Sequence, residues 1–192
     1  MPDHRLMPRH ALGGDAPRRA ALGAVTIVEG PDLAIASLAA RRDGAGACHA
    51  ALADLTGRPP PAPGRIDGAT GIEALWSGPD QWLLLAPHGT HEDLPDRVKA
   101  RVGASGSVTE QTDGWVCLTV TGAGTTALFE RICMLDTAAA TPGFAARTPI
   151  HHIAAFVICD AGGWRVLGPR SSAASLFDAL AHTAGNLAET TP

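Results

Sequence analysis

The sequence is poor in aromatic residues and in charge. It contains no tyrosine, four tryptophans and four phenylalanines among 192 residues. Only 18% of its residues are charged, against an average of about 25% in soluble domains. Because 45% of the residues are hydrophobic, we nevertheless expect a globular protein with a buried core rather than a disordered chain.

Long apolar runs and a secretory leader are also missing. No run of about 18 apolar residues is present, so we expect no membrane-spanning helix. Residues 1–24 hold four arginines against two aspartates, and they lack the apolar segment of a signal peptide. We interpret residues 1–24 as a flexible basic arm, and we expect a cytoplasmic protein with reduced cysteines.

The composition also limits partners and redox chemistry. The net charge is −4, and no cluster of lysines and arginines is interleaved with aromatic residues, which argues against nucleic-acid binding. The four cysteines form no CxxC pair, and three of them lie within apolar runs. We therefore predict buried, reduced thiols that pack as small hydrophobic groups.

Catalytic motifs are absent as well, because GxSxG, HExxH and SxxK do not occur. The segment Gly122–Gly124 is placed like a phosphate-binding loop, but it lacks the third glycine of the dinucleotide fingerprint and the lysine of a P-loop. We interpret it as a tight strand-to-helix turn. Arg147 and Arg170 can each hold an anion, the latter at a helix N-terminus, although an exposed guanidinium beside a helix cap is the favoured interpretation.

The histidines do not form a metal-binding pattern. His151 and His152 fall in a predicted strand, where adjacent side chains point to opposite faces and cannot bind one metal together. His88 and His91 lie three residues apart in a predicted loop with no cysteine or carboxylate at a metal-ligand spacing. Asp113 precedes a glycine, and Asp-Gly is typical of a hairpin turn.

The periodicity of the apolar residues predicts a protein of mixed strands and helices. Strands are expected over residues 25–29, 33–40, 72–76, 81–86, 107–111, 115–121, 150–159 and 164–168. Helices are expected over residues 47–57, 92–102, 125–135 and 171–185. The order reads β-α-β-β-α-β followed by β-α-β-β-α, with a frayed tail over residues 187–192.

Two hairpin-like segments resemble each other. "ALWSGPDQWLLLAP" and "AFVICDAGGWRVLGP" each place a strand, an Asp/Gly turn, a tryptophan, an apolar strand and a proline before a helix. Trp82 and Trp164 occupy the same place in the two segments, which favours an architectural role over a catalytic one. Asp80 can serve as a general base beside aromatic rings, but a turn residue bonded to its own backbone is favoured.

Taken in order, five segments resemble the gamma subunit of heterotetrameric sarcosine oxidase. They are "LWSGPDQWLLLAP", "SVTEQTDGWVCLTVTG", "LFERICMLD", "RTPIHHIAAFVI" and "WRVLGPRSSAASLFDAL". The resemblance runs from about residue 33 to residue 180. Ser77 departs from the family, in which a larger residue is common at this point of the hairpin.

The resemblance implies an α+β fold related to the folate-binding aminomethyltransferase group. Such a fold consists of two tandem ferredoxin-like halves, here residues 25–112 and 113–186, whose antiparallel sheets carry helices on one face. It also implies a complex with alpha-, beta- and delta-type subunits that converts sarcosine to glycine, with formaldehyde or methylene-tetrahydrofolate, and hydrogen peroxide. FAD, FMN, NAD and tetrahydrofolate would be bound by the other subunits, and this chain would bind none.

The resemblance supplies no catalytic, cofactor-binding or metal-binding residue. The residues that we expect to fix a hairpin or contact another subunit are Trp76, Asp80, Trp82, Trp115 and Trp164. Two alternatives stay open. One is the small subunit of a related dehydrogenase of N-methyl amino acids such as N-methylglutamate, and the other is a free-standing folate-binding aminomethyltransferase-like protein.

Overall fold

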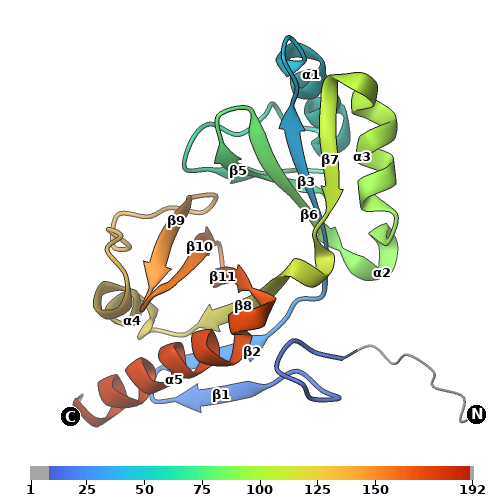
Figure 1. The fold of residues 1–192 in the computed structure, drawn as a ribbon. Helices are drawn as coiled ribbons and strands as arrows, with labels where there is room; N and C mark the ends of the chain where they lie inside the picture. Colours follow the sequence, from blue (N-terminus) through green and yellow to red (C-terminus); the bar gives the residue numbers. More distant parts are fainter. Residues whose placement is uncertain (1–8, 191–192) are drawn as a thin grey trace, which may run out of the picture.

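The computed structural model describes residues 9–190, which form two antiparallel β-sheets and their covering helices (Figure 1). The first sheet has five strands in the order β4-β5-β6-β3-β7. These strands are β3 (Leu33–Ala40), β4 (Ile66–Asp67), β5 (Glu73–Gly78), β6 (Gln81–Pro87) and β7 (Gly106–Glu110). Its helices are α1 (Ala45–Thr56), α2 (His88–His91) and α3 (Leu94–Val102), followed by the short 3-10 helix η1 (Gly103–Ser105).

Helix α1 forms where the apolar spacing predicts it. Cys48, Leu52 and Leu55 recur at helical intervals, and all three are buried against the sheet. The helix ends at Gly57, which has a left-handed φ of 68° and donates its N–H to the carbonyl of Ala53. Glycine adopts this conformation without a steric penalty, so it ends the helix at low cost.

The second sheet has six strands in the order β1-β2-β8-β11-β10-β9. These strands are β1 (Arg19–Leu22), β2 (Val25–Glu29), β8 (Trp115–Thr121), β9 (Ala145–Ile150), β10 (Ile153–Asp160) and β11 (Gly163–Pro169). Its helices are α4 (Thr125–Ile132) and α5 (Ala173–Thr190), and the 3-10 helix η3 (Arg170–Ser172) precedes α5.

The two halves share one ferredoxin-like topology, which confirms the expected α+β fold. In the first half, β3-α1-β5-β6-α3-β7 follows the βαββαβ order, and the main strands lie side by side as β5-β6-β3-β7. In the second half, the corresponding strands lie as β10-β11-β8-β2. The fourth strand of the second half therefore comes from β2, which precedes the whole first half in the sequence.

Because β2 belongs to the sheet of the second half, the expected start of the first half at residue 25 is wrong. Residues 25–29 were expected to begin that half, but β2 pairs with β8 through Thr26↔Thr121 to Glu29↔Leu118. The expected arm, residues 1–24, also contributes a strand, because β1 pairs with β2. Residues 1–8 of that arm lie outside the described residues.

Three further predictions about local structure are wrong. Residues 107–121 do not form a hairpin around Asp113, because β7 and β8 belong to different sheets and η2 (Thr112–Gly114) connects them. The predicted strand 150–159 is broken by a turn at His151–His152, which separates β9 from β10. Helix α5 continues to Thr190, so residues 187–190 are helical rather than frayed, and residues 191–192 are not described.

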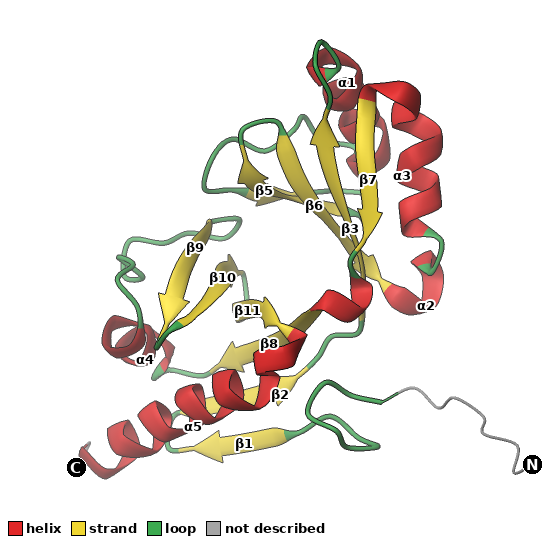
Figure 2. Ribbon diagram, viewed as in Figure 1, coloured by secondary structure: helices red, strands yellow, loops and turns green. Residues whose placement is uncertain are grey.

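The sheets face each other, and the helices cover their outer faces (Figure 2). One apolar cluster lies between the first sheet and α1 and α3, and another between the second sheet and α4 and α5. A third cluster joins strands of both sheets, with Ile35, Leu75 and Leu85 from the first and Phe156 and Leu167 from the second. The helix-free face of each half is therefore buried against the other half.

Candidate functional site

The two hairpin tryptophans that the sequence pairs occupy equivalent positions. Trp82 is 3% exposed and packs in the cluster beneath α1 and α3, with its ring centroid 5.4 Å from that of His49. Trp164 is 6% exposed and packs in the cluster beneath α4 and α5, 5.0 Å from the ring of Phe129. Each tryptophan is the second residue of the returning strand of its hairpin and fills the helix-facing core of its own half.

Asp80 lies in the turn between β5 and β6 with a left-handed φ of 54°. Its carbonyl accepts the N–H of Ala40 at 2.9 Å, and its carboxylate lies 3.7 Å from Nε2 of His49. The side chain is 58% exposed. Aspartate tolerates the left-handed conformation better than most residues, so these contacts are those of a turn residue.

Trp76 and Trp115 are both half-buried and lie in different environments. Trp76 is directly opposite Trp82 in the β5–β6 register, so the two side chains share the helix-facing side of the sheet. The register shifts between Trp76 and Gly78. Trp115 packs instead against the inter-sheet cluster, 5.9 Å from the ring of Phe156. The structure therefore brings Trp76, Asp80 and Trp82 together, and keeps Trp115 and Trp164 apart from them.

Among the described residues, the histidines and cysteines form no group that could hold a metal ion. His88 and His91 lie on α2, and the former is 3.9 Å from Asp32. Within residues 9–190 no group of three potential metal ligands is present. Burial raises the pKa of the Cys117 thiol to about 12, partly opposed by the nearby Arg165 cation, so this thiol is protonated and a poor nucleophile at neutral pH. Burial also raises the pKa of Cys48, Cys133 and Cys159.

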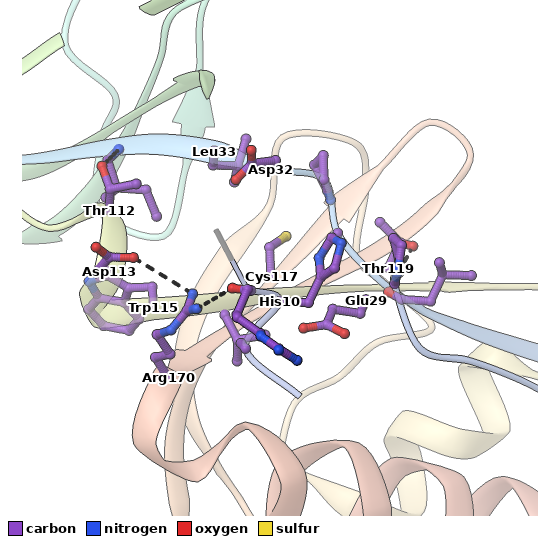
Figure 3. A pocket seen from close by; sticks show the side chains of 18 of the residues that line it. His10, Glu29, Asp32, Leu33, Thr112, Asp113, Trp115, Cys117, Thr119 and Arg170 are labelled. Carbon is purple, nitrogen blue, oxygen red and sulfur yellow. Dashed lines mark hydrogen bonds and ion pairs between the residues drawn. The ribbon is translucent and has the colours of Figure 1, made fainter. Parts of the chain in front are cut away.

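A pocket of about 810 Å³ lies beside the crossover between the halves (Figure 3). Its walls come from residues 9–17, the linker from β2 to β3, the segment from η2 to β8, and Arg170 of η3. The apolar part of the lining includes Val28, Leu33, Ile35, Trp115 and Val116. A pocket of this volume and lining is typical of a small-molecule site.

Several charged groups of this pocket contact one another or the backbone, whereas Asp32 lies 3.9 Å from His88, outside the lining. Nη2 of Arg170 donates to the carbonyl of Arg9 at 2.6 Å, and Nη1 lies 3.8 Å from the carboxylate of Asp113 (Figure 3). Arg9 is 3.2 Å from Asp15. These contacts engage the Arg170 guanidinium within the chain, and its side chain is 34% exposed.

Arg147 and the segment Gly122–Gly124, which were also considered as anion sites, make local contacts. Arg147 is exposed on β9, and its guanidinium lies 5.7 Å from the centre of the Phe156 ring. Gly122 has a φ of 113°, and a Cβ there would come within 2.1 Å of the carbonyl oxygen of Ala24. A side chain cannot be accommodated at that distance, which confirms that Gly122–Gly124 forms a tight turn against the neighbouring strand.

Two buried or nearly buried charged groups, Glu29 and Arg165, were not predicted from the sequence. Glu29 is 4% exposed, and its carboxylate accepts the N–H groups of Leu12 at 2.9 Å and Arg18 at 3.1 Å. The side chain of Arg165 is 11% exposed and binds the carboxylates of Glu73 and Asp160. Because side chains alternate between the two faces of a strand, Glu29 lies on the same side of β2 as Val25 and Ile27. This alternation is the feature of the sequence from which the burial of Glu29 could have been predicted.

The fold and these contacts define a class of protein: an α+β chain of two interlocked ferredoxin-like halves, consistent with the folate-binding-like fold of the aminomethyltransferases. No helix among residues 9–190 is long and apolar enough to cross a membrane. No protein-family model matches the sequence, and no curated protein matches it.

Solved structures do match this chain, although no family model and no curated protein does. The chain is similar to a chain of the heterotetrameric sarcosine oxidase from Corynebacterium sp. U-96, with a TM-score of 0.78 and 24% identity over 90% of each chain. It is also similar to the glycine cleavage system aminomethyltransferase T from Bartonella henselae, with a TM-score of 0.60 and 12% identity. That match covers 83% of this chain and 46% of the transferase, so the chain spans about half the length of that enzyme. At these identities the likeness shows a shared fold.

Proposed function

We propose that this chain is a non-catalytic gamma-type subunit of a heterotetrameric oxidase complex that demethylates sarcosine. The observation that carries the proposal is the likeness to a chain of a heterotetrameric sarcosine oxidase over 90% of the length of both chains. A match over nearly all of both chains favours a counterpart of the same size and organisation. The aminomethyltransferase, by contrast, is about twice as long.

In this proposal the chemistry takes place on partner chains of the alpha, beta and delta types. Those chains would bind FAD, FMN, NAD and tetrahydrofolate. The complex would oxidise sarcosine to glycine, with the methyl carbon leaving as formaldehyde or methylene-tetrahydrofolate and O2 reduced to hydrogen peroxide. The residues described above support a structural role, because the cysteines have raised pKa values and the Arg170 and Arg165 guanidinium groups are engaged by the chain itself. Such groups stabilise a fold and offer no activated nucleophile.

The proposal assigns the contact with partner chains to exposed or half-buried groups. Trp82 and Trp164 are buried within their own halves and cannot reach a partner without unfolding. Trp76 and Trp115 are half-buried, and Met134 is 93% exposed in the segment that follows α4. Aromatic residues and methionine are enriched at protein interfaces, so these three side chains are the candidates for subunit contacts.

Co-expression with the alpha-, beta- and delta-type chains of a sarcosine oxidase tests the proposal. We expect a higher soluble yield and a single heteromeric species in size-exclusion chromatography with light scattering. The isolated chain should lack flavin absorbance and sarcosine-dependent peroxide formation. Sarcosine turnover by the isolated chain, or a stable monomer that never co-purifies with those partners, would contradict the proposal.

The likeness to aminomethyltransferase T favours a second candidate, a free-standing folate-binding protein. Titration calorimetry of the isolated chain with tetrahydrofolate separates the two. Micromolar binding would favour the folate-binding protein, and no heat change would favour the subunit. Assaying the assembled complex with sarcosine and with N-methylglutamate would identify the amino acid that it oxidises.

A further inference from the structure

The N-terminal strap, residues 9–18, forms one wall of the pocket described above. Arg9, His10, Ala11, Asp15 and Pro17 all line the cavity. The opposite lining comes from the strand linker and from β8, including Cys117. The strap therefore separates the inner lining of the pocket from solvent on one side, and its attachment decides how accessible that lining is.

Glu29 joins Leu12, within the strap, to Arg18 at the C-terminal end of the strap. Its Oε1 accepts the N–H of Leu12 at 2.9 Å, and its Oε2 accepts the N–H of Arg18 at 3.1 Å. The backbone N–H of Glu29 also donates to the carbonyl of Arg18 at 2.8 Å. One carboxylate thus closes a loop of the chain, and no cation within residues 9–190 forms an ion pair with it.

The two ends of the strap are not held equally. At the Arg18 end the backbone continues into β1, and the Arg18 guanidinium lies 3.2 Å from Asp178 and 4.4 Å from the centre of the Phe177 ring. At the Leu12 end the described contacts are the hydrogen bond to Glu29, the donation from Nη2 of Arg170 to the carbonyl of Arg9 at 2.6 Å, and the packing of Ala11 and Leu12 against the core of the second half. Loss of either polar anchor would weaken the attachment of this end, so that it opens more often, while leaving β1 paired.

We infer that the strap is a hinged cover over the pocket, with Glu29 and Arg170 as its two latches. The hinge lies where the strap joins β1, and opening exposes the inner lining around Trp115 and Cys117. A carboxylate that accepts two backbone N–H groups suits this purpose, because the bonds are directional and are exchanged for water when the strap swings out. The inference concerns this chain alone and does not depend on the proposed subunit role.

Glu29→Gln tests the first latch in the full-length chain. The amide side chain keeps the size of glutamate, but its NH2 group cannot accept a hydrogen bond, so one of the two backbone N–H groups loses its partner. We expect hydrogen exchange across residues 9–18 to be about tenfold faster than in the wild type, with no change in β8. Glu130→Gln, at an exposed carboxylate on α4, is the matched control and should leave exchange unchanged.

Alkylation of Cys117, located by mass spectrometry, reports the opening of the pocket. Cys117 is 7% exposed behind the strap, so its labelling should accelerate about tenfold in Glu29→Gln. Labelling of Cys48 and Cys159, which do not line the pocket, should stay at the wild-type rate. Equal acceleration at all three cysteines would mean general unfolding and would overturn the inference.

Arg170→Met tests the second latch independently. This test can be made even if Glu29→Gln fails to fold. Methionine keeps an unbranched apolar side chain and removes the donor to the Arg9 carbonyl. Cys117 labelling should increase, while the Arg18 amide stays protected because Glu29 still accepts it. A folded Glu29→Gln or Arg170→Met variant in which labelling of Cys117 equals that of Glu130→Gln would overturn the inference.

Discussion

Arg165 on β11 and Glu73 on β5 form a two-pronged ion pair that joins the two sheets. Nη1 of Arg165 lies 2.7 Å from Oε2 of Glu73, and Nη2 lies 3.0 Å from Oε1. The same guanidinium binds Asp160 through Nε at 2.7 Å and Nη2 at 2.9 Å. One cation therefore holds a carboxylate of each half at the contact between the sheets.

Replacing Arg165 by methionine should destabilise the protein by roughly 2 kcal/mol, because it leaves two carboxylates close together without a cation. The value is below that of a fully buried pair, since Glu73 and Asp160 are 35% and 36% exposed and water screens them. Urea unfolding measures the change. Arg101→Met removes an exposed ion pair with Asp54 and should change stability by less than about 1 kcal/mol. Equal effects of the two substitutions would refute the role assigned to Arg165.

Trp82→Ala should cost on the order of 3–5 kcal/mol, because it empties a buried site beneath α1 and α3. Asp80→Asn should cost no more than about 1 kcal/mol, since asparagine also adopts the left-handed turn conformation. Thermal and urea unfolding of both variants check these values. If Asp80→Asn abolished the activity of an assembled complex while stability and assembly were retained, a catalytic role for Asp80 would replace the turn interpretation.

His151 should be sensitive to β-branching, because its φ of 52° is left-handed. His151→Val is expected to cost about 1–2 kcal/mol, whereas His151→Asn should be close to neutral. Chemical denaturation of the two variants gives the comparison. A neutral effect of His151→Val would show that the β9–β10 turn does not require this backbone conformation.

Stability should fall in alkaline solution through Cys117. The folded-state pKa of its thiol is raised from 9.0 to about 12, so the unfolded chain loses this proton first as the pH rises above 9. The stabilisation is complete below pH 9 and disappears as the pH approaches 12, with a loss of up to about 2 kcal/mol by pH 10.5. Unfolding in urea at pH 8 and at about pH 10.5 measures this loss, which should be smaller in Cys117→Ala. An identical loss in both proteins would assign the alkaline effect to other groups.

Much of the local structure could be predicted from the sequence. The spacing of Cys48, Leu52 and Leu55 before Gly57 determined α1, because a helix places such residues on one face and glycine adopts the left-handed conformation that ends it. The similarity of the two hairpin segments correctly placed Trp82 and Trp164 in equivalent core positions. Both predictions rest on interactions between residues that are near one another in the sequence.

Tertiary structure alone decided the rest. The strand Val25–Glu29 was predicted, but its pairing with β8 joins residues about ninety positions apart in the sequence, such as Val28 and Thr119. Likewise, Glu29 receives its partners only when the strap folds back, and Arg165 meets Glu73 only when the two sheets pack together. Apolar periodicity determines which side of an element is buried, whereas the partner of a charged group or an edge strand is set by chain packing over long sequence separations.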